Sequence, residues 1–300
     1  MNELPMTEQT NPDTVDLDLL PTSDLLERIA SADASVPAAV AAELPAIVAA
    51  VDAIVERMRR GGRLIYLGAG TSGRLAVMEA AEARPTFGTE PDQVIGLMAG
   101  GQGAQARADE RAEDDEAAGA AEMRRLDIGP DDAVVALSAS GVTPFAVAAA
   151  REARSRGALT ISVACGHPTP LGDAVKLAIH PLTGPEVVAG STRMKAGTAQ
   201  KLVVNMLTTA AMVRLGKVYR NLMVDVRASN RKLRERARRI VAEVTAASPD
   251  EIEAALESSG WSARLAIAMV ATGHSADDAR ELLATRSLRD VIDGRDGGSR

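Results

Sequence analysis

Aromatic residues, cysteine and histidine are all scarce in this chain of 300 residues. Aromatics make up only 2% of it, so the core must be aliphatic, and base stacking on nucleic acid is disfavoured. The single cysteine, Cys165, excludes an internal disulfide and a cysteine-based zinc site. The three histidines, His167, His180 and His274, show no metal-ligand spacing. We therefore expect a site without a metal.

The chain also lacks a basic charge balance and a long uninterrupted apolar run. Its formal net charge of −7 gives no overall field for a polyanion, so a small anionic ligand would need local donors. The start of the chain is polar and carries no signal-peptide pattern. The alanine-rich segment 36–55 is interrupted by Pro37, Glu43, Pro45 and Asp52, unlike a membrane span. We expect a soluble, cytoplasmic protein that binds neither nucleic acid nor membrane.

Short apolar runs alternate with helical patterns through the middle of the chain. Five runs are expected to form strands: 63–67, 93–99, 133–137, 159–164 and 175–179. Helices are expected at 24–32, 37–60, 72–83, 104–125, 144–156 and 192–215. Strands joined by helical crossovers form a parallel sheet with helices on both faces. The pattern predicts an α/β fold with a doubly wound, five-stranded parallel sheet, which binds ligands beyond the carboxyl ends of its strands.

The end of the chain changes character at Ala228, where the composition becomes charged and helical. Short helices are expected to start at Ser248, where S-P-D-E forms a capping box, near Trp261 and at Ser275. We therefore expect N-terminal helices over 1–60, a sheet domain over 61–227 and a small helical, UBA-like domain over 228–300.

The first glycine-rich turn, LIYLGAGTSG at 64–73, fits the dinucleotide fingerprint G-x-G-x-x-G. That function needs a carboxylate after the second strand, but this strand ends in QVIGLMAGG. Gly70, Thr71 and Ser72 instead offer backbone amides and hydroxyls at a helix start, which suits a phosphate monoester. The alternative is that the glycines only permit a tight turn.

A second turn, Ser138-Ala-Ser-Gly-Val-Thr-Pro144, has the same design. Ser138, Ser140 and Thr143 supply hydroxyls, Gly141 allows close approach of a ligand to the backbone, and the proline fits a first helical turn. Alone it could be an ordinary helix cap. Two hydroxyl-rich turns at the same ends of predicted strands favour a sugar phosphate.

A third loop, GPEVVAGSTRMKAGT at 184–198, carries two cations, Arg193 and Lys195, in an otherwise acidic chain. Ser191 and Thr192 are candidates for helix capping or for donation to phosphate. Glu186 could accept bonds from sugar hydroxyls or be an exposed surface residue. The alternative for the whole loop is a solvated helix start.

The paired hydroxyl loops resemble those of the sugar isomerase (SIS) domain family. LIYLGAGTSGRL, AGGQGA, GPEVVAGSTRMKAGTAQKLVVNML and GKVYRNLMVDV extend the resemblance to the N-acetylmuramic acid 6-phosphate etherases, over nearly the whole chain. Such enzymes cleave a lactyl ether in the recycling of cell-wall amino sugars. They remove the proton at C2 of the open-chain sugar, expel lactate from C3 and add water, and carboxyl groups can carry out each proton transfer without a cofactor.

The resemblance implies Glu82 and Glu113 as the catalytic carboxylates. Glu82 also shares a helix face with Leu75, Met78 and Glu79, and burial there would raise its pKa as a general acid requires. The acidic run around Glu113 would otherwise be taken for a solvated surface. Two positions depart from the family pattern. Ala83-Arg84-Pro85 stands in place of Cys-Pro-Pro, and valine stands at 142 in place of arginine.

Two other functions share the fold that the resemblance implies. One is a non-catalytic regulator that binds a sugar phosphate, and the other is a sugar-phosphate isomerase. Both implied glutamates are present and the chain has one SIS-type unit, which favours the etherase. We also expect a homodimer, with the apolar segment 202–215 contributing to the contact.

Overall fold

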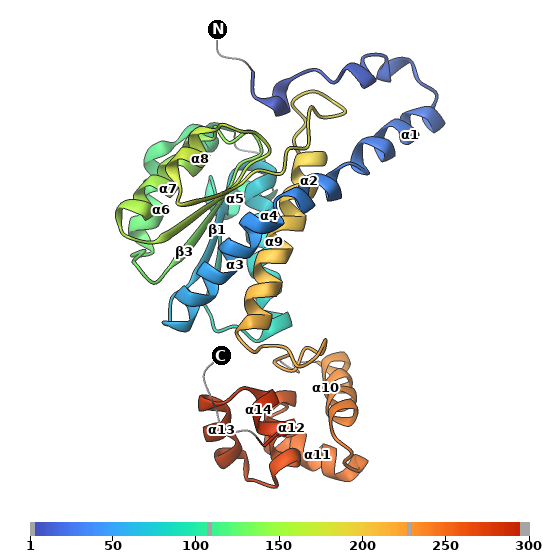
Figure 1. The fold of residues 1–300 in the computed structure, drawn as a ribbon, viewed down its shortest axis with the longest axis vertical. Helices are drawn as coiled ribbons and strands as arrows, with labels where there is room; N and C mark the ends of the chain where they lie inside the picture. The colour runs from blue at the N-terminus through green and yellow to red at the C-terminus, as the bar shows by residue number, and fades with distance from the viewer. Residues whose placement is uncertain (1–3, 107–109, 227, 229, 295–300) are drawn as a thin grey trace. The chain divides into compact units, whose positions relative to one another are not determined.

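The computed structural model describes residues 4–106, 110–226, 228 and 230–294. Five strands form one sheet: β1 (Leu64–Gly68), β2 (Val94–Met98), β3 (Ala133–Leu137), β4 (Leu159–Val163) and β5 (Leu177–Ile179). The strand order is β2-β1-β3-β4-β5 and every pair is parallel. The predicted doubly wound sheet is confirmed, and its strands end within a few residues of the expected positions (Figure 1).

Helices cover both faces of this sheet, as expected for parallel strands. The helices between strands are α4 (Gly70–Phe87), α5 (Gly101–Ala106), α6 (Glu116–Arg125), α7 (Pro144–Ser155) and α8 (Pro170–Ala174), and α9 (Lys195–Arg214) follows the last strand. Ile65 and Leu67 of β1 pack in one core with the buried face of α7. Tyr66 points to the other face, where its hydroxyl lies 2.7 Å from that of Thr208 on α9.

The N-terminal helices differ from the single long helix expected at 37–60. They are α1 (Thr22–Asp33), α2 (Val36–Ala42) and α3 (Leu44–Arg59), preceded by the short 3-10 turns η1 (Met6–Glu8), η2 (Pro12–Thr14) and η3 (Leu17–Leu19). The prediction missed the break at Glu43. Pro45 explains it, since proline fits the first turn of α3 but cannot continue a helix from α2. The chain bends by 58° there.

The expected helix 104–125 is also divided, into α5, the 3-10 turn η4 (Glu110–Asp114) and α6. Asp115 separates the last two, because its side chain accepts the amide of Ala118 as an N-cap. Gly119 then lets α6 approach α7 closely, since a Cβ there would lie 2.2 Å from the carbonyl oxygen of Phe145. Residues 110–114, which precede α6, also pack against α7.

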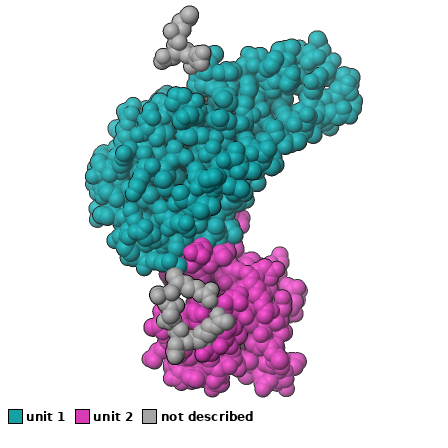
Figure 2. Space-filling view, in the orientation of Figure 1, with its two compact units in different colours: residues 1–81, 91–211 teal, residues 82–90, 212–300 magenta. Residues whose placement is uncertain are grey.

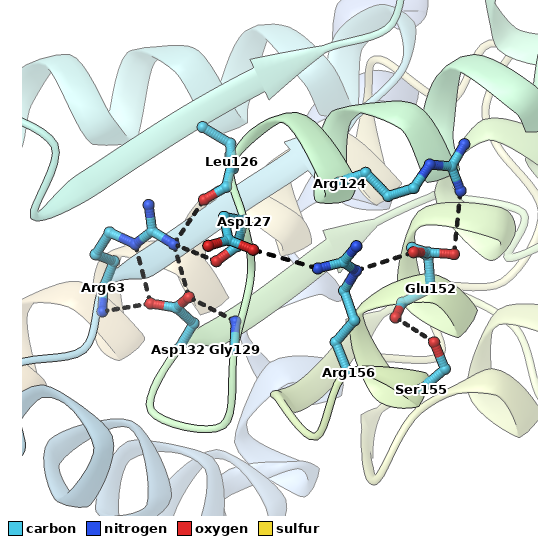
Figure 3. A network of polar contacts seen from close by, with 9 residues as sticks. All are labelled: Arg63, Arg124, Leu126, Asp127, Gly129, Asp132, Glu152, Ser155 and Arg156. Carbon is cyan, nitrogen blue, oxygen red and sulfur yellow. Dashed lines mark hydrogen bonds and ion pairs between the residues drawn. The ribbon is translucent and has the colours of Figure 1, made fainter.

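A partly buried ion pair joins the amino ends of β1 and β3, at the edge of the sheet opposite the glycine-rich turns. The Arg63 guanidinium donates to both carboxylate oxygens of Asp132, at 3.0 and 2.7 Å, and to the carbonyl of Leu126 at 2.9 Å (Figure 3). Gly129 adds a backbone amide to the same carboxylate. Arg63 holds the pKa of Asp132 below its usual value despite burial, which acts to raise it.

The chain divides into two compact units, residues 1–81 with 91–211 and residues 82–90 with 212–300 (Figure 2). Residues 212–226, which we assigned to the sheet domain, cluster with the C-terminal helices. These are α10 (Arg231–Val244), α11 (Pro249–Ser258), α12 (Ala263–Thr272), α13 (Ala276–Thr285) and α14 (Leu288–Ile292). The predicted capping box of α11 is present, formed by Ser248 and Glu251.

No single helix among the described residues is long and apolar enough to span a membrane. The bent helix pair Thr22–Ala42 and Leu44–Arg59 has the length and composition of a membrane span when its two halves are taken together, but nothing else indicates one.

Candidate active site

The two hydroxyl-rich turns lie side by side at the carboxyl ends of β1 and β3. A Cβ on Gly68 would lie 2.9 Å from the carbonyl oxygen of Leu137, so the ends of the two strands are in direct contact. Gly70 and Gly141 both have positive φ, at 52° and 74°, where glycine is favoured. Parallel sheets bind ligands at this edge, beyond the carboxyl ends of their strands.

The start of α9 joins these turns. A Cβ on Gly197, in the first turn of α9, would lie 3.4 Å from the Thr71 side chain. The Ser72 hydroxyl donates to the Gln200 side chain at 2.8 Å, and Gln200 donates to the carbonyl of Val163 at the end of β4. Three loops that are distant in sequence therefore meet at one edge of the sheet. Gln200 was not among the predicted site residues, although a glutamine inside an apolar helix could have indicated a buried polar contact.

Ser72 is buried and its hydroxyl proton is directed to Gln200. A phosphate at this turn would thus meet the backbone amides that begin α4 and the half-buried Thr71 hydroxyl. These are the donors that the first loop offers.

The second turn contains a chain of hydrogen bonds that ends on a carboxylate. The Gly141 amide donates to the Ser138 hydroxyl at 3.0 Å, and this hydroxyl lies 2.8 Å from the Thr143 hydroxyl. Thr143 donates to Glu113 Oε1 at 3.0 Å. Ser138 and Thr143 are buried, whereas Glu113 and Ser140 are partly exposed. Glu113, which the pattern of residues alone would have left on the surface, is thus brought to the edge where the turns lie.

Glu186 is not the exposed surface residue that was one of the two alternatives, and its contact with sugar hydroxyls stays a prediction. Its side chain is completely buried, and its two oxygens accept the amides of Lys195 and Ala196 at 3.0 and 2.9 Å. It caps α9, a role that we had given to Ser191 or Thr192. A carboxylate suits this position because the N-terminus of a helix carries partial positive charge.

The remaining third-loop residues have different environments. Lys195 is buried and donates to the carbonyl of Thr183 at 2.7 Å. Ser191 and Thr192 are half-buried, and Arg193 is exposed in the turn before α9. The loop is supported by the N-terminal segment, since Gly190 donates its amide to the carbonyl of Thr7. Arg193 is the cation of this loop that faces solvent.

Glu82 is exposed on α4, so the argument that placed it on a buried helix face was wrong. The buried carboxylate of that face is Glu79, which pairs with Lys201 of α9 at 2.8 Å.

Neither a reactive thiol nor a cluster of metal ligands is found among the residues that the structure describes. Burial raises the pKa of Cys165 to about 12, so its thiol is not a nucleophile at neutral pH. Within the described ranges, no group of three or more histidine, cysteine, aspartate or glutamate residues is placed to hold a metal ion.

Known proteins resemble this chain along most of its length. The SIS domain family model matches residues 29–165. A Rubrobacter xylanophilus protein named N-acetylmuramic acid 6-phosphate etherase is 52% identical, over 96% of this chain and 95% of its own. A Vibrio cholerae protein named N-acetylmuramic acid 6-phosphate etherase 2 is 50% identical, over 93% and 91%. Among solved structures, a phosphoheptose isomerase from Francisella tularensis shares the fold, with a TM-score of 0.51 and 19% identity, over 65% of this chain and all of its own.

Proposed function

The chain belongs to the family of N-acetylmuramic acid 6-phosphate etherases, and from that premise we propose that it catalyses the reaction in the family's name. It is a lyase that converts N-acetylmuramic acid 6-phosphate and water to N-acetylglucosamine 6-phosphate and D-lactate, in the cytoplasm, during amino-sugar recycling. The observation that carries the proposal is the contact between Glu113 and Thr143, which puts a carboxylate beside two phosphate-binding turns.

The phosphate is bound by donors of the three loops. The amides at the start of α4 and the hydroxyls of Thr71 and Ser140 face this edge of the sheet, and Arg193 adds a positive charge. The sugar then extends from the phosphate toward Glu113. The exposed Val142 side chain offers no hydrogen-bond donor to the sugar phosphate at this turn.

The reaction needs groups that move protons. The aldehyde of the open-chain sugar acidifies the C2 proton, a base removes it, and the C3–O bond breaks as an acid protonates the departing lactate oxygen. Water then adds to C3 of the unsaturated aldehyde, and C2 takes up a proton that exchanges with solvent. Glu113 and Glu82 carry these transfers, and the residues described here require no cofactor for them.

We propose a homodimer as the active form. Glu113 contacts the second turn of its own chain, and Glu82 is exposed on α4, where a second copy can receive it. Half of the apolar residues of 202–215 are buried within the chain, and Met206 and Val213 are its exposed large ones. Met78 of α4 is also exposed. Light scattering of active protein tests the dimer, and a monomer at the assay concentration would contradict it.

Release of lactate from N-acetylmuramic acid 6-phosphate tests the activity itself. Glu113→Gln should lose about 100-fold or more in kcat, because an amide cannot transfer the proton. Glu116→Gln is the matched control, an exposed carboxylate three residues away. In ¹⁸O-labelled heavy water, the label should enter the sugar at C3 and deuterium should appear at C2. Absence of lactate release, or ¹⁸O in the lactate hydroxyl with none at C3, would overturn the proposal.

A further inference from the structure

The motif GKVYRNLMVDV at 216–226 takes no part in the reaction proposed above, but it lines a cleft in the C-terminal unit. The cleft has a volume of about 490 Å³, within the range of about 300–1,000 Å³ that is typical of small-molecule sites. Its lining residues all belong to the unit of residues 82–90 and 212–300, whereas the three loops of the sheet edge belong to the other unit. The polar and aromatic side chains that line it include Lys217, Asp225, Trp261 and Arg264.

Two cations in this cleft share one carboxylate oxygen. Lys217 Nζ and Arg264 Nη1 each lie 3.3 Å from Oδ2 of Asp225. A charge-assisted bond between a nitrogen cation and a carboxylate is ordinarily about 2.7–2.9 Å long, so both contacts are long. Arg264 Nε is buried and has no hydrogen-bond partner among the residues that the structure describes. The two side chains therefore keep donors that Asp225 does not use.

The charge around the cleft is positive, although the chain as a whole is acidic. The Arg234 guanidinium lies 4.7 Å over the ring of Trp261, which lines the cleft. Arg238 lies over the same ring at 4.8 Å, but it is paired with Glu253 at 2.7 Å. Arg234 and the two cations that share a carboxylate thus leave an excess of two positive charges. A phosphate monoester, which carries about −1.5 to −2 charges at pH 7, neutralises this excess.

Backbone contacts fix the walls of the cleft. The Arg264 amide donates to the carbonyl of Val224 at 3.0 Å, which ties the start of α12 to the motif. A Cβ on Gly88 would lie 2.3 Å from the carbonyl oxygen of Asp225, so the turn after α4 packs directly on the same segment. The Asp225 side chain is only 12% exposed. The two cations are therefore gathered around a fixed carboxylate rather than spread over a flexible surface.

Trp261 adopts an unfavourable backbone conformation where it lines the cleft. Its φ is 65°, in a region that favours glycine and is rare for an aromatic residue. The Trp261 amide donates to the carbonyl of Leu256 at 2.7 Å, which holds the residue in this conformation after the end of α11. Backbone strain of this kind is concentrated at ligand sites. Because Trp261 is the only tryptophan of the chain, it also provides an optical probe of this cleft.

We propose that this cleft binds the phosphate group of a small phosphorylated metabolite. The unused donors of Arg264 and Lys217 bind the phosphate oxygens, and Asp225 keeps the two cations together. This site goes beyond the proposed lyase activity and does not depend on it, since its residues take no part in the proton transfers assigned to Glu82 and Glu113.

Titration of the Trp261 fluorescence with inorganic phosphate tests the proposal, with the ionic strength held constant by sodium chloride. We expect a saturable change in emission. Arg264→Gln and Lys217→Gln should each raise the dissociation constant about 10- to 100-fold, the effect of losing one hydrogen bond to a charged group. Asp225→Asn should lower the dissociation constant, because it removes the negative charge that competes with phosphate for both cations.

Control variants separate this cleft from the turns at the edge of the sheet. Arg193→Gln removes a cation of the third loop, and Arg239→Gln removes an exposed arginine of α10. Both should leave the fluorescence titration unchanged. Arg264→Lys keeps the positive charge and should bind phosphate more tightly than Arg264→Gln. Far-ultraviolet circular dichroism checks that each variant retains its helices.

Three further ligands identify the chemical group that the cleft recognises. N-acetylglucosamine 6-phosphate should change the emission as phosphate does, whereas N-acetylglucosamine and D-lactate, which lack a phosphate group, should not. The inference is overturned by an emission that phosphate leaves unchanged, by a response to lactate in place of phosphate, or by equal affinity of the wild type and the variants Arg264→Gln and Lys217→Gln. An intact titration in a protein that releases no lactate would contradict only the proposed function.

Discussion

Replacing Glu186 with glutamine should destabilise the fold without weakening substrate binding. The carboxylate is fully buried, and each of its oxygens accepts one amide at the start of α9. A glutamine has one oxygen, so one of the two amides would face an NH₂ group and lose its acceptor. The variant also removes a negative charge from the positive end of a 20-residue helix.

The size of the effect follows from these two losses. A buried amide left unpaired costs about 1–3 kcal/mol. Loss of the charge–dipole interaction adds about 1 kcal/mol, and up to about 2 in a buried geometry. We therefore expect the free energy of unfolding to fall by about 2–5 kcal/mol. Glu8→Gln is the matched control. Glu8, from the N-terminal segment, lies beside Gly190 of the loop that contains Glu186, but it is exposed. Its replacement should change the free energy of unfolding by less than about 0.5 kcal/mol.

Urea unfolding followed by far-ultraviolet circular dichroism measures the change. A lower midpoint with an unchanged slope indicates a loss of stability rather than a changed unfolded state. Hydrogen exchange should also accelerate at the amides of Lys195 and Ala196. If stability is unchanged while KM for the phosphosugar rises, Glu186 contacts the sugar and the capping argument is refuted.

Two further predictions concern buried groups away from the turns. Asp132→Asn should lower stability by about 2–3 kcal/mol, since it breaks a partly buried ion pair with Arg63. The folded pKa of Asp132 is lowered, so its contribution to stability is present above the unfolded pKa of about 3.9 and is lost as the pH falls through the folded value. Urea midpoints between about pH 5 and pH 2 should thus fall less steeply in the variant, and equal slopes would contradict the assignment. Cys165 should resist iodoacetamide at pH 8 in the folded protein and react on unfolding, because burial raises its pKa to about 12. Rapid alkylation of the native thiol, measured by mass spectrometry, would show that it is accessible.

The sheet was predictable from the sequence because each strand is a short apolar run that ends at a turn. Gly70 and Gly141 marked two of those turns, and both adopt the positive φ that glycine allows. Helix continuity was less predictable. The apolar spacing runs through Glu43, and only the steric effect of Pro45 on the preceding turn divides α2 from α3.

The roles of the site residues could not be derived from residue type alone. A hydroxyl in a glycine-rich turn can donate to phosphate or to a neighbouring side chain, and Ser72 takes the second course because Gln200 lies within reach. That partner comes from a helix 128 positions later in the chain. The capping role of Glu186 could not be foreseen for the same reason, since its partners are amides that only the folded start of α9 presents. Glu113 was identified by resemblance, because its acidic run has no apolar spacing.

The core of the sheet face under α7 is made largely of alanine. Ala146, Ala149, Ala150 and Ala153 are completely buried along that helix. Alanine scanning is the usual way to locate a core by mutation. It cannot report on these four positions, because the native residue is already alanine. Enlargement is the informative perturbation, since side chains added to a close-packed layer force backbone shifts that cost about 1–3 kcal/mol. Libraries that replace these four alanines by larger residues should therefore find positions of α7 that alanine scanning cannot probe.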